Sequence, residues 1–233
     1  MAHQVLGGRR TRGAAAALGI GLLLFAGMCS TFPGRDREFE EALRVFAEKR
    51  EPDSEIALFN GRDLSGWAAH GLGKWTVKEG VITVRRGIGY LATRCDAWED
   101  FILSLDVRVS EQGNSGIFFR SRHPGIGLRP WPLGYEAQVD NHDPKNYTGS
   151  LYKRVHVTNP RIADEEWFAM RISAVGPRIQ IQINGETVVD ATDSAFTRGF
   201  IAFQAHDPFS RVDFRDIRLR IPTKKESTPR PGK

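Results

Sequence analysis

The feature that most constrains the fold of this chain is an alternation of apolar and mostly polar residues that starts at Phe101. Apolar side chains occupy every second position from Phe101 to Val109. A period of two fits a half-buried antiparallel strand and does not fit a helix. The turn-forming run Glu111–Asn114 follows, and two more strand-like runs, Gly116–Arg120 and Tyr135–Asp140, come after it. We therefore expect three strands in this segment.

Strand and turn signals of the same kind recur along most of the chain. From residue 55 onward we count about a dozen short strands, with turn signals roughly every 8 to 12 residues and no helical pattern between them. Asn184-Gly185 favours a type I′ turn. The apolar phase of the last strand changes near Arg215-Asp216, which predicts a β-bulge. The pattern predicts an all-β fold, a jelly-roll β-sandwich of two antiparallel sheets.

The N-terminus differs in composition from this β-rich region. Three arginines precede an apolar stretch of 14 residues, Ala14–Gly27, which is short for a membrane span and typical of an export signal. Cys29 follows one residue later, where bacterial lipoproteins carry the cysteine that receives lipid. Lipidation at Cys29, simple cleavage and an uncleaved anchor all stay open. We expect residues 1–34 to be a signal peptide or lipoprotein anchor, and the protein to be exported to the periplasm or cell envelope.

The remaining boundaries follow from composition. Asp36–Arg50 has apolar residues at helical spacing, with acids early and basic residues late, so residues 35–54 should hold a short amphipathic helix and a linker. We interpret this helix as a spacer or packing helix. The sandwich should span residues 55–221 as one domain, which a chain of 233 residues with 40% hydrophobic content can fill. Residues 222–233, charged and rich in proline, predict a disordered tail.

The net charge of +5 arises from the two ends of the chain. The first 34 residues carry three arginines and no acid, and residues 222–233 carry a net charge of +3, so residues 35–221 carry about −1. A nucleic-acid partner is therefore not expected. Contact with a membrane is expected only through the N-terminal segment, and the oligomeric state stays open.

Polar residues inside the later strands are the candidates for a functional site. Because side chains alternate along a strand, Glu136, Gln138 and Asp140 share one face. By the same parity, two other strands each present three residues on one face: Gly116, Phe118 and Arg120 on one, and Ala202, Gln204 and His206 on the other.

If these sets belong to one sheet, they converge over a hollow. Gly116 and Ala202 would leave room there for a sugar ring. Trp131 and Tyr152 could supply aromatic surface on which the ring stacks.

Eight blocks of the chain resemble, in the same order, those of the 3-keto-disaccharide hydrolase family, long known as a domain of unknown function. The blocks are Phe59–Trp67, Asn114–Arg120, Gly134–Asp140, Thr148–Tyr152, Glu166-Trp167, Ile183–Gly185, Gln204–His206 and Phe214–Ile217. The resemblance covers about residues 55–221. It implies a concanavalin-like jelly roll that acts on glycosides oxidised at C3. The chain departs from the family at Asp207, where glycine is usual.

The spacing of the carboxylates argues against ordinary glycosidase chemistry. A retaining glycosidase needs two carboxyl groups about 5 Å apart, and an inverting one about 6.5 to 9.5 Å. The Cα atoms of Glu136 and Asp140 on an extended strand are roughly 13 Å apart. A 3-keto sugar needs only one base, because its carbonyl acidifies the hydrogen on C2. The substituent at C1 then leaves by elimination and water adds back.

For this chemistry we expect Glu136 or His206 to be the base and the other to be the acid, with Arg120 holding the enolate or the substrate. The expected substrate-binding residues are Gln138, Asp140, Tyr152, Gln204 and Trp131. Structural alternatives stay open: Glu136 and Arg120 could form a cross-strand ion pair, and His206 could be a structural histidine. We interpret Asp140–Asp143 as a polar loop in preference to a divalent metal site, and expect no metal or other cofactor.

Two classes of function remain. One is an enzyme that cleaves 3-keto-glycosides, by hydrolysis or by elimination and hydration. The other is an exported carbohydrate-binding module without catalysis, because a jelly roll serves both. In either case the partner is a saccharide, oxidised in the enzymatic case. Convergence of Glu136, Arg120 and His206 on one cavity would favour the enzyme, and a shallow aromatic surface would favour the binding module.

Overall fold

The fold is described from a computed structural model that covers residues 36–125, 130–159, 162–223 and 225–226. The expected signal segment, residues 1–34, and most of the expected tail lie outside the described residues. The helix is α1 (Arg37–Lys49), and the strands are β1 (Glu55–Ala57), β2 (Trp67–Gly71), β3 (Lys74–Lys78), β4 (Val81–Arg85), β5 (Gly89–Thr93), β6 (Phe101–Val109), β7 (Asn114–Arg122), β8 (Leu133–Asp140), β9 (Phe168–Val175), β10 (Arg178–Ile183), β11 (Glu186–Thr192), β12 (Phe200–Ala205) and β13 (Arg211–Arg220).

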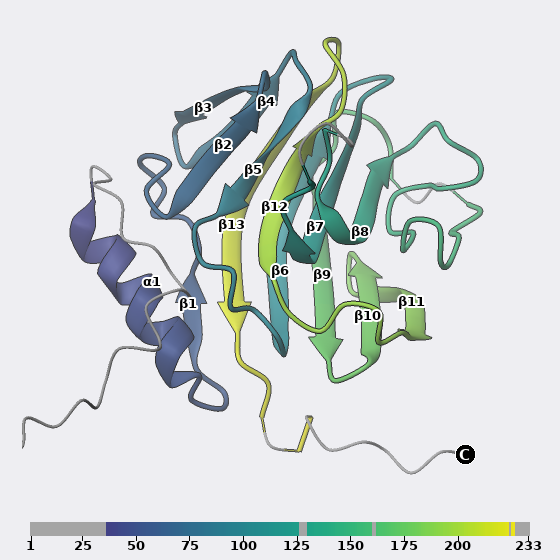
Figure 1. The fold of residues 1–233 in the computed structure, drawn as a ribbon. Coiled ribbons are helices and arrows are strands. Elements are labelled where there is room, and N and C mark those ends of the chain that lie inside the picture. Colours follow the sequence, from purple (N-terminus) through teal and green to yellow (C-terminus); the bar gives the residue numbers. More distant parts are fainter. Residues whose placement is uncertain (1–35, 126–129, 160–161, 224, 227–233) are drawn as a thin grey trace, which may run out of the picture.

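The strands form two antiparallel sheets that face each other, as Figure 1 shows. The larger sheet has the order β11-β10-β9-β6-β13-β4-β3. β4 pairs with the first part of β13, and β1 pairs with its last part. The smaller sheet has the order β2-β5-β12-β7-β8. The expected two-sheet jelly-roll sandwich is therefore confirmed. The turn after β6 carries the chain from the larger sheet to the smaller one, so β6 does not lie beside β7.

The core fills the space between the sheets. In β6 every second residue from Phe101 to Val109 is buried, as the alternation predicts. Each such side chain contributes about 1.5 to 3 kcal/mol on leaving water. Aromatic rings join the two layers: Phe203 of β12 stacks on Trp67 at 4.9 Å and on Phe214 of β13 at 4.2 Å between centroids. The sandwich is thus held by packing across one continuous apolar layer.

Two local predictions are confirmed. The register of β13 against β6 shifts between Arg215 and Arg218, and Asp216 has a φ of 51°, which is the expected bulge. Asn184 and Gly185 have φ values of 49° and 82°, as a type I′ turn requires. The sequence prediction missed β2 and β5, which form one side of the smaller sheet.

The helix expected near residue 36 is present and packs on the sandwich. Asp36 caps it by accepting a hydrogen bond from the backbone N of Phe39 at 3.0 Å. Leu43 and Ala47 are buried in the core. The carboxylate of the buried Glu40 accepts a hydrogen bond from the backbone N of Gly66 at 3.1 Å. Figure 1 shows α1 beside β1 at the edge of the larger sheet.

In the described part of the chain, no helix has both the length and the apolar character that a membrane crossing requires.

Candidate functional site

The smaller sheet has one face in the core and one face turned away from it, which we call the outer face. Leu91, Ile117 and Phe203 point into the core. A separate cluster of buried residues covers the outer face: Tyr90, Ala92, Phe118, Phe200 and Ala202, with Trp131 packed against them. Because Glu136 pairs with Phe118 across β7 and β8, it faces outward as well. The outer face therefore carries the side chains of Phe118 and Glu136 together.

A row of side chains crosses this face from β8 to β2. Gln138 is opposite Gly116, Gln204 is opposite Tyr90, and Tyr90 is opposite His70. The register of β12 with β7, continued by one residue, puts Gln204 beside Gly116. Gly116 has no side chain, so no side chain of β7 stands between the two glutamines in this row.

Both glutamines of this row are buried with their amide oxygens unused. Gln138 and Gln204 are each 4% exposed. Neither Oε1 atom has a hydrogen-bond partner among the described residues. A buried acceptor without a partner costs about 1 to 3 kcal/mol, so such groups usually await a ligand or ordered water. Two of them in one row indicate a binding site for hydrogen-bond donors.

Glu136 lies next to this row with its carboxyl group over Gly116. A Cβ atom at Gly116 would be 2.1 Å from Glu136 Oε1. Glu136 is 8% exposed, and its carboxylate has no hydrogen bond or ion pair with any residue that the structure describes. Burial raises its pKa to about 8, and the positive charge of Lys153 opposes the rise. A carboxyl group in this state is a candidate acid or base near neutral pH.

His206 lies at the end of the outer face, after β12. Its ring stacks on Trp131 with centroids 5.6 Å apart and planes 7° apart. Nδ1 of His206 lies 3.4 Å from Asp207 Oδ2. Oδ1 of Asp207 also accepts hydrogen bonds from the backbone N of Phe209 at 2.7 Å and of Ser210 at 2.8 Å. The acid found where the family usually has glycine therefore holds this loop in shape and contacts the histidine.

Arg120 does not join these residues. The register of β7 with β8 shifts between Phe119 and Arg122, and Arg120 has a φ of 48°, so the strand bulges and the expected parity is lost. The side chain is 2% exposed. It donates to the carbonyl oxygens of Glu99 and Gly176, each at 2.8 Å.

The predicted place of Arg120 on the face of Gly116 and Phe118 is therefore wrong, as is its ion pair with Glu136. Its guanidinium lies instead 3.1 Å from Asp100 Oδ1. The predicted convergence of three residues is reduced to Glu136 and His206 on the outer face. The cation whose charge acts on Glu136 is Lys153.

Asp140 lies on the expected face, but its carboxylate is engaged in a turn. Oδ1 accepts hydrogen bonds from the backbone N of His142 at 2.7 Å and of Asp143 at 3.1 Å. Oδ2 accepts one from Asn114 Nδ2 at 2.8 Å. Asp140 thus stabilises a turn, in place of the contact with sugar hydroxyls that its parity suggested. Oδ1 of Asn114 in turn lies 3.4 Å from Gln138 Nε2.

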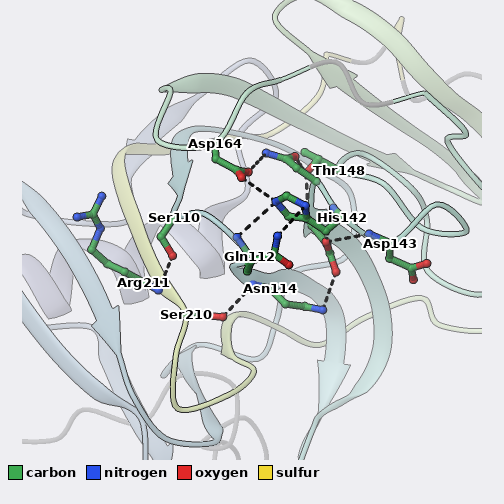
Figure 2. Close-up of polar contacts among 11 residues, drawn as sticks. Ser110, Gln112, Asn114, His142, Asp143, Thr148, Asp164, Ser210 and Arg211 are labelled. Carbon is green, nitrogen blue, oxygen red and sulfur yellow. Dashed lines mark hydrogen bonds and ion pairs between the residues drawn. The ribbon is translucent and has the colours of Figure 1, made fainter.

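Figure 2 shows the polar network around this turn. His142 Nε2 lies 2.7 Å from Asp164 Oδ2, and the backbone N of Asn114 donates to Ser210 Oγ at 2.9 Å. The network joins the loops after β8 and β12 at the end of the smaller sheet. Within the described ranges, no three His, Cys, Asp or Glu side chains are grouped as metal ligands. Asp140 ends β8, and the residues after it form a turn held by the carboxylate of Asp140.

Tyr152 is adjacent to the site through its backbone. Its N–H donates to the carbonyl oxygen of Glu136 at 2.9 Å. The Nζ atom of Lys153 lies 5.2 Å from the centre of the Tyr152 ring. This turn after β8 therefore brings the positive charge of Lys153 toward Glu136. The alternation of side chains along strands could not predict this proximity, because Lys153 lies in a turn and not in a strand.

The other half of the outer face is aromatic. His70 of β2 stacks on Tyr90 of β5 at 4.8 Å, and His123 lies 4.7 Å from His70. The hydroxyl of Tyr90 is 2.8 Å from His123 Nδ1. Burial lowers the pKa of both histidines. Sequence reasoning missed these residues because it missed the strands that carry two of them.

Comparison with known proteins agrees with this fold. Residues 54–220 match the family model described as the 3-keto-alpha-glucoside-1,2-lyase-like domain. A curated relative, the 3-keto-disaccharide hydrolase of Bacteroides thetaiotaomicron, is 32% identical over 79 residues. The match covers 29% of this chain and 27% of that relative, so the chain spans about a quarter of the relative's length.

Solved structures resemble the sandwich as a whole. A candidate glycosyl hydrolase from Parabacteroides distasonis aligns with a TM-score of 0.62 and 21% identity, over 72% of this chain and 93% of that one. The carbohydrate-binding module CBM66 from Bacillus subtilis aligns with a TM-score of 0.53 and 20% identity, over 66% and 95% of the two chains. At such identities the likeness concerns the fold alone.

Proposed function

Because the chain belongs to the family of 3-keto-alpha-glucoside-1,2-lyase-like domains, we propose that it cleaves the glycosidic bond of glycosides oxidised at C3. The name of the curated relative, a 3-keto-disaccharide hydrolase, supports this class of substrate.

The observation that carries the proposal is the buried carboxyl group of Glu136. It lies over Gly116, beside the unpartnered amide oxygens of Gln138 and Gln204, and its pKa is raised to about 8. A carboxylate with a raised pKa is a stronger base than an ordinary one, and it can change protonation state near neutral pH. Removal of a proton next to a carbonyl needs such a base.

The reaction that we propose begins at C2 of the sugar. Glu136 takes the proton from C2, which is acidic because C3 is a carbonyl carbon, and the electron pair forms an enolate. The enolate then expels the oxygen at C1, so a double bond forms between C1 and C2 and the leaving oxygen takes up a proton. Water adds at C1 and a proton returns to C2. The sum is hydrolysis, and the first half alone is a lyase reaction.

The remaining roles belong to residues of the outer face and to Lys153 in the turn after β8. His206 donates the proton to the leaving oxygen and thereby takes the role of the acid. Lys153 replaces Arg120 as the cation that stabilises the enolate, because the positive charge of Lys153 acts on the carboxyl group of Glu136. Gln138 and Gln204 accept hydrogen bonds from sugar hydroxyls with their unused oxygens. Trp131 stacks against the sugar or the leaving group.

A direct experiment tests the reaction. The purified protein is incubated with a 3-keto-glucoside and with its unoxidised parent, each with and without a chelator, and release of the alcohol is measured. Selective cleavage of the oxidised substrate is expected. Equal cleavage of both compounds, or of neither, contradicts the proposal.

The second candidate function is carbohydrate binding without catalysis. The stacked rings of Trp131 and His206 favour it, since such a surface can hold a sugar without any base. The same experiment distinguishes the two functions. A binding module retains the saccharide, as measured by calorimetry, and releases no alcohol.

A further inference from the structure

His206 is in contact with a carboxylate on its own loop. Nδ1 of the histidine lies 3.4 Å from Oδ2 of Asp207, the next residue in the chain. Glycine, which is usual at this position in the family, has no group that could make such a contact. The pair of imidazole and carboxylate therefore sets this chain apart from the usual pattern of the family.

Three hydrogen bonds hold the carboxylate of Asp207 in place. Oδ1 accepts from the backbone N of Phe209 at 2.7 Å and of Ser210 at 2.8 Å, and Oδ2 accepts from the hydroxyl of Ser210 at 2.6 Å. The Ser210 hydroxyl in turn accepts from the backbone N of Asn114 at 2.9 Å (Figure 2). The carboxylate is thus fixed by its own loop, and the loop is tied to the start of β7.

The same contacts keep Asp207 ionised. Burial works to raise the pKa of this carboxyl group, but the hydrogen bonds from Ser210 and Phe209 outweigh it, and the pKa lies below its ordinary value. An ionised carboxylate accepts hydrogen bonds and cannot donate one. A proton shared between Asp207 and His206 therefore belongs to Nδ1 of the histidine.

Trp131 holds the same imidazole from its flat side. The two rings are nearly parallel, with 7° between their planes and 5.6 Å between their centroids. Stacking on Trp131 and the contact of Nδ1 with Asp207 together restrict rotation of the ring. Nε2 of His206 has no hydrogen-bond partner among the described residues, and the side chain is 41% exposed. Nε2 is therefore the nitrogen that remains available to a substrate.

We propose that Asp207 is a positioning residue for His206, which it holds in the orientation and the tautomer that let Nε2 protonate the leaving oxygen. This inference rests on the proposed function. The imidazolium that gives up the proton has an N–H group on each nitrogen, and Asp207 supplies the acceptor for the one at Nδ1. When the bond between C1 and the leaving oxygen breaks, its electron pair stays on the oxygen, which takes the proton from Nε2. The ring is left neutral, with its remaining proton on Nδ1.

Asp207→Asn removes the charge and preserves the loop. The amide oxygen can still accept from the two backbone N–H groups, but the amide nitrogen is a donor and cannot accept the proton at Nδ1. Two substrates are compared: methyl 3-keto-glucoside, whose leaving oxygen needs a proton, and 4-nitrophenyl 3-keto-glucoside, whose phenolate leaves without one. We expect kcat to fall at least about 10-fold on the methyl substrate and less than about 2-fold on the aryl substrate.

A purely structural role of Asp207 would not give this difference, because a loosened loop would slow both substrates by similar factors. Asp143→Asn is the matched control. Oδ1 of Asp143 accepts from the backbone N of Lys145 at 2.9 Å and Oδ2 from Nδ2 of Asn146 at 2.8 Å, so it also stabilises a turn, and neither partner is a histidine. This variant should keep both rates.

The position of the proton can be measured without a substrate. Nitrogen NMR of protein labelled at histidine, with the signals of His206 assigned by their loss in His206→Gln, reports the tautomer of the neutral ring. We expect the proton on Nδ1 in the wild type and on Nε2 in Asp207→Asn.

The outcomes separate the inference from the proposed function. The same tautomer in both proteins, equal losses of kcat on the two substrates, or a selective loss on the methyl substrate in Asp143→Asn would each overturn the inference and leave the proposed function intact. Release of alcohol from neither substrate by the wild-type protein would overturn the proposed function, and the role of Asp207 in it.

Discussion

The carboxyl group of Glu136 occupies the space that a side chain at Gly116 would need. A Cβ atom at Gly116 would come within 2.1 Å of Glu136 Oε1 and within 2.8 Å of its Cδ and Cγ atoms. The two residues sit on neighbouring strands, β8 and β7, and the glycine lets the carboxyl group lie flat on the sheet between Gln138 and Gln204. The position of the proposed base therefore depends on the absence of a side chain in the next strand.

Gly116→Ala should displace Glu136 and remove most of the activity. The contacts are with the flexible end of one side chain, so the fold should survive with a loss of about 1 to 3 kcal/mol, as for other overpacked sites. We expect kcat/KM on a 3-keto-glucoside to fall by roughly 100-fold, because small displacements of a base have such effects. The measurement is steady-state kinetics together with thermal unfolding.

A double variant identifies the cause of this loss. In a protein that already carries Glu136→Gln, the alanine at position 116 should reduce the remaining activity very little, since both changes act on one group. If the two losses were instead independent and multiplied, Gly116 would have a role separate from Glu136.

Stability should depend on pH through Glu136. Its pKa is about 8 in the folded protein and close to 4.5 in the unfolded chain, so the folded state holds the proton more tightly. Its contribution to stability is therefore full below about pH 4.5 and declines as the pH rises toward 8. The free energy of unfolding should fall by roughly 1 kcal/mol per pH unit in that range.

Glu136→Gln should abolish this decline. Glutamine has the same shape and no charge, so the variant should match the wild type near pH 4.5 and be more stable by a few kcal/mol at pH 8. Denaturant unfolding of both proteins at several pH values measures the difference. Parallel curves for the two proteins would mean that the carboxyl group does not hold its proton in the folded state.

Activity should depend on pH in the opposite direction. If Glu136 is the base, kcat/KM should rise with an apparent pKa near 8, because only the carboxylate accepts a proton. The charge of Lys153 lowers the pKa of Glu136, so Lys153→Gln should move the rising limb to higher pH. Lys145→Gln, an exposed lysine on another turn, is the control and should leave the profile in place. A rate that falls above pH 8 would assign Glu136 to the role of acid.

The period-two pattern was sufficient to predict the sandwich. It located β6, whose alternation comes from one face in the core and one face toward solvent. It failed for β5, because Tyr90 and Ala92 on the outer face are buried as well as Leu91 on the inner face. A strand covered on both sides shows no alternation, so its partner β2 and the aromatic half of the site were missed with it.

The candidate site was predictable where the strands are regular. Glu136 and Gln138 share a face because β8 has a regular register through these positions. Arg120 could not be placed, because a bulge with φ of 48° shifts its side chain to the other side, and arginine gives no signal for that conformation. Lys153 could not be placed either, since its proximity to Glu136 arises from a turn.

Arg120 should contribute to stability and not directly to chemistry. Its guanidinium is buried and donates to the carbonyl oxygens of Glu99 and Gly176 while facing Asp100, so it joins the start of β6 to the turn between β9 and β10. Arg120→Ala would leave these carbonyl groups without a donor and should cost about 3 to 5 kcal/mol. Arg218→Ala is the control. Its ion pair with Glu55 is exposed and should be worth less than about 1 kcal/mol.

Arg120→Lys separates structure from catalysis. Lysine keeps the charge but cannot reach both carbonyl groups, so the variant should be destabilised by a smaller amount than the alanine variant and remain folded at low temperature. Under those conditions its kcat/KM and the pH at which activity rises should match those of the wild type, because Arg120 does not face Glu136. A folded lysine variant with a large loss of kcat would instead return Arg120 to the role of enolate clamp, and the bulge in β7 would then have to reverse when substrate binds.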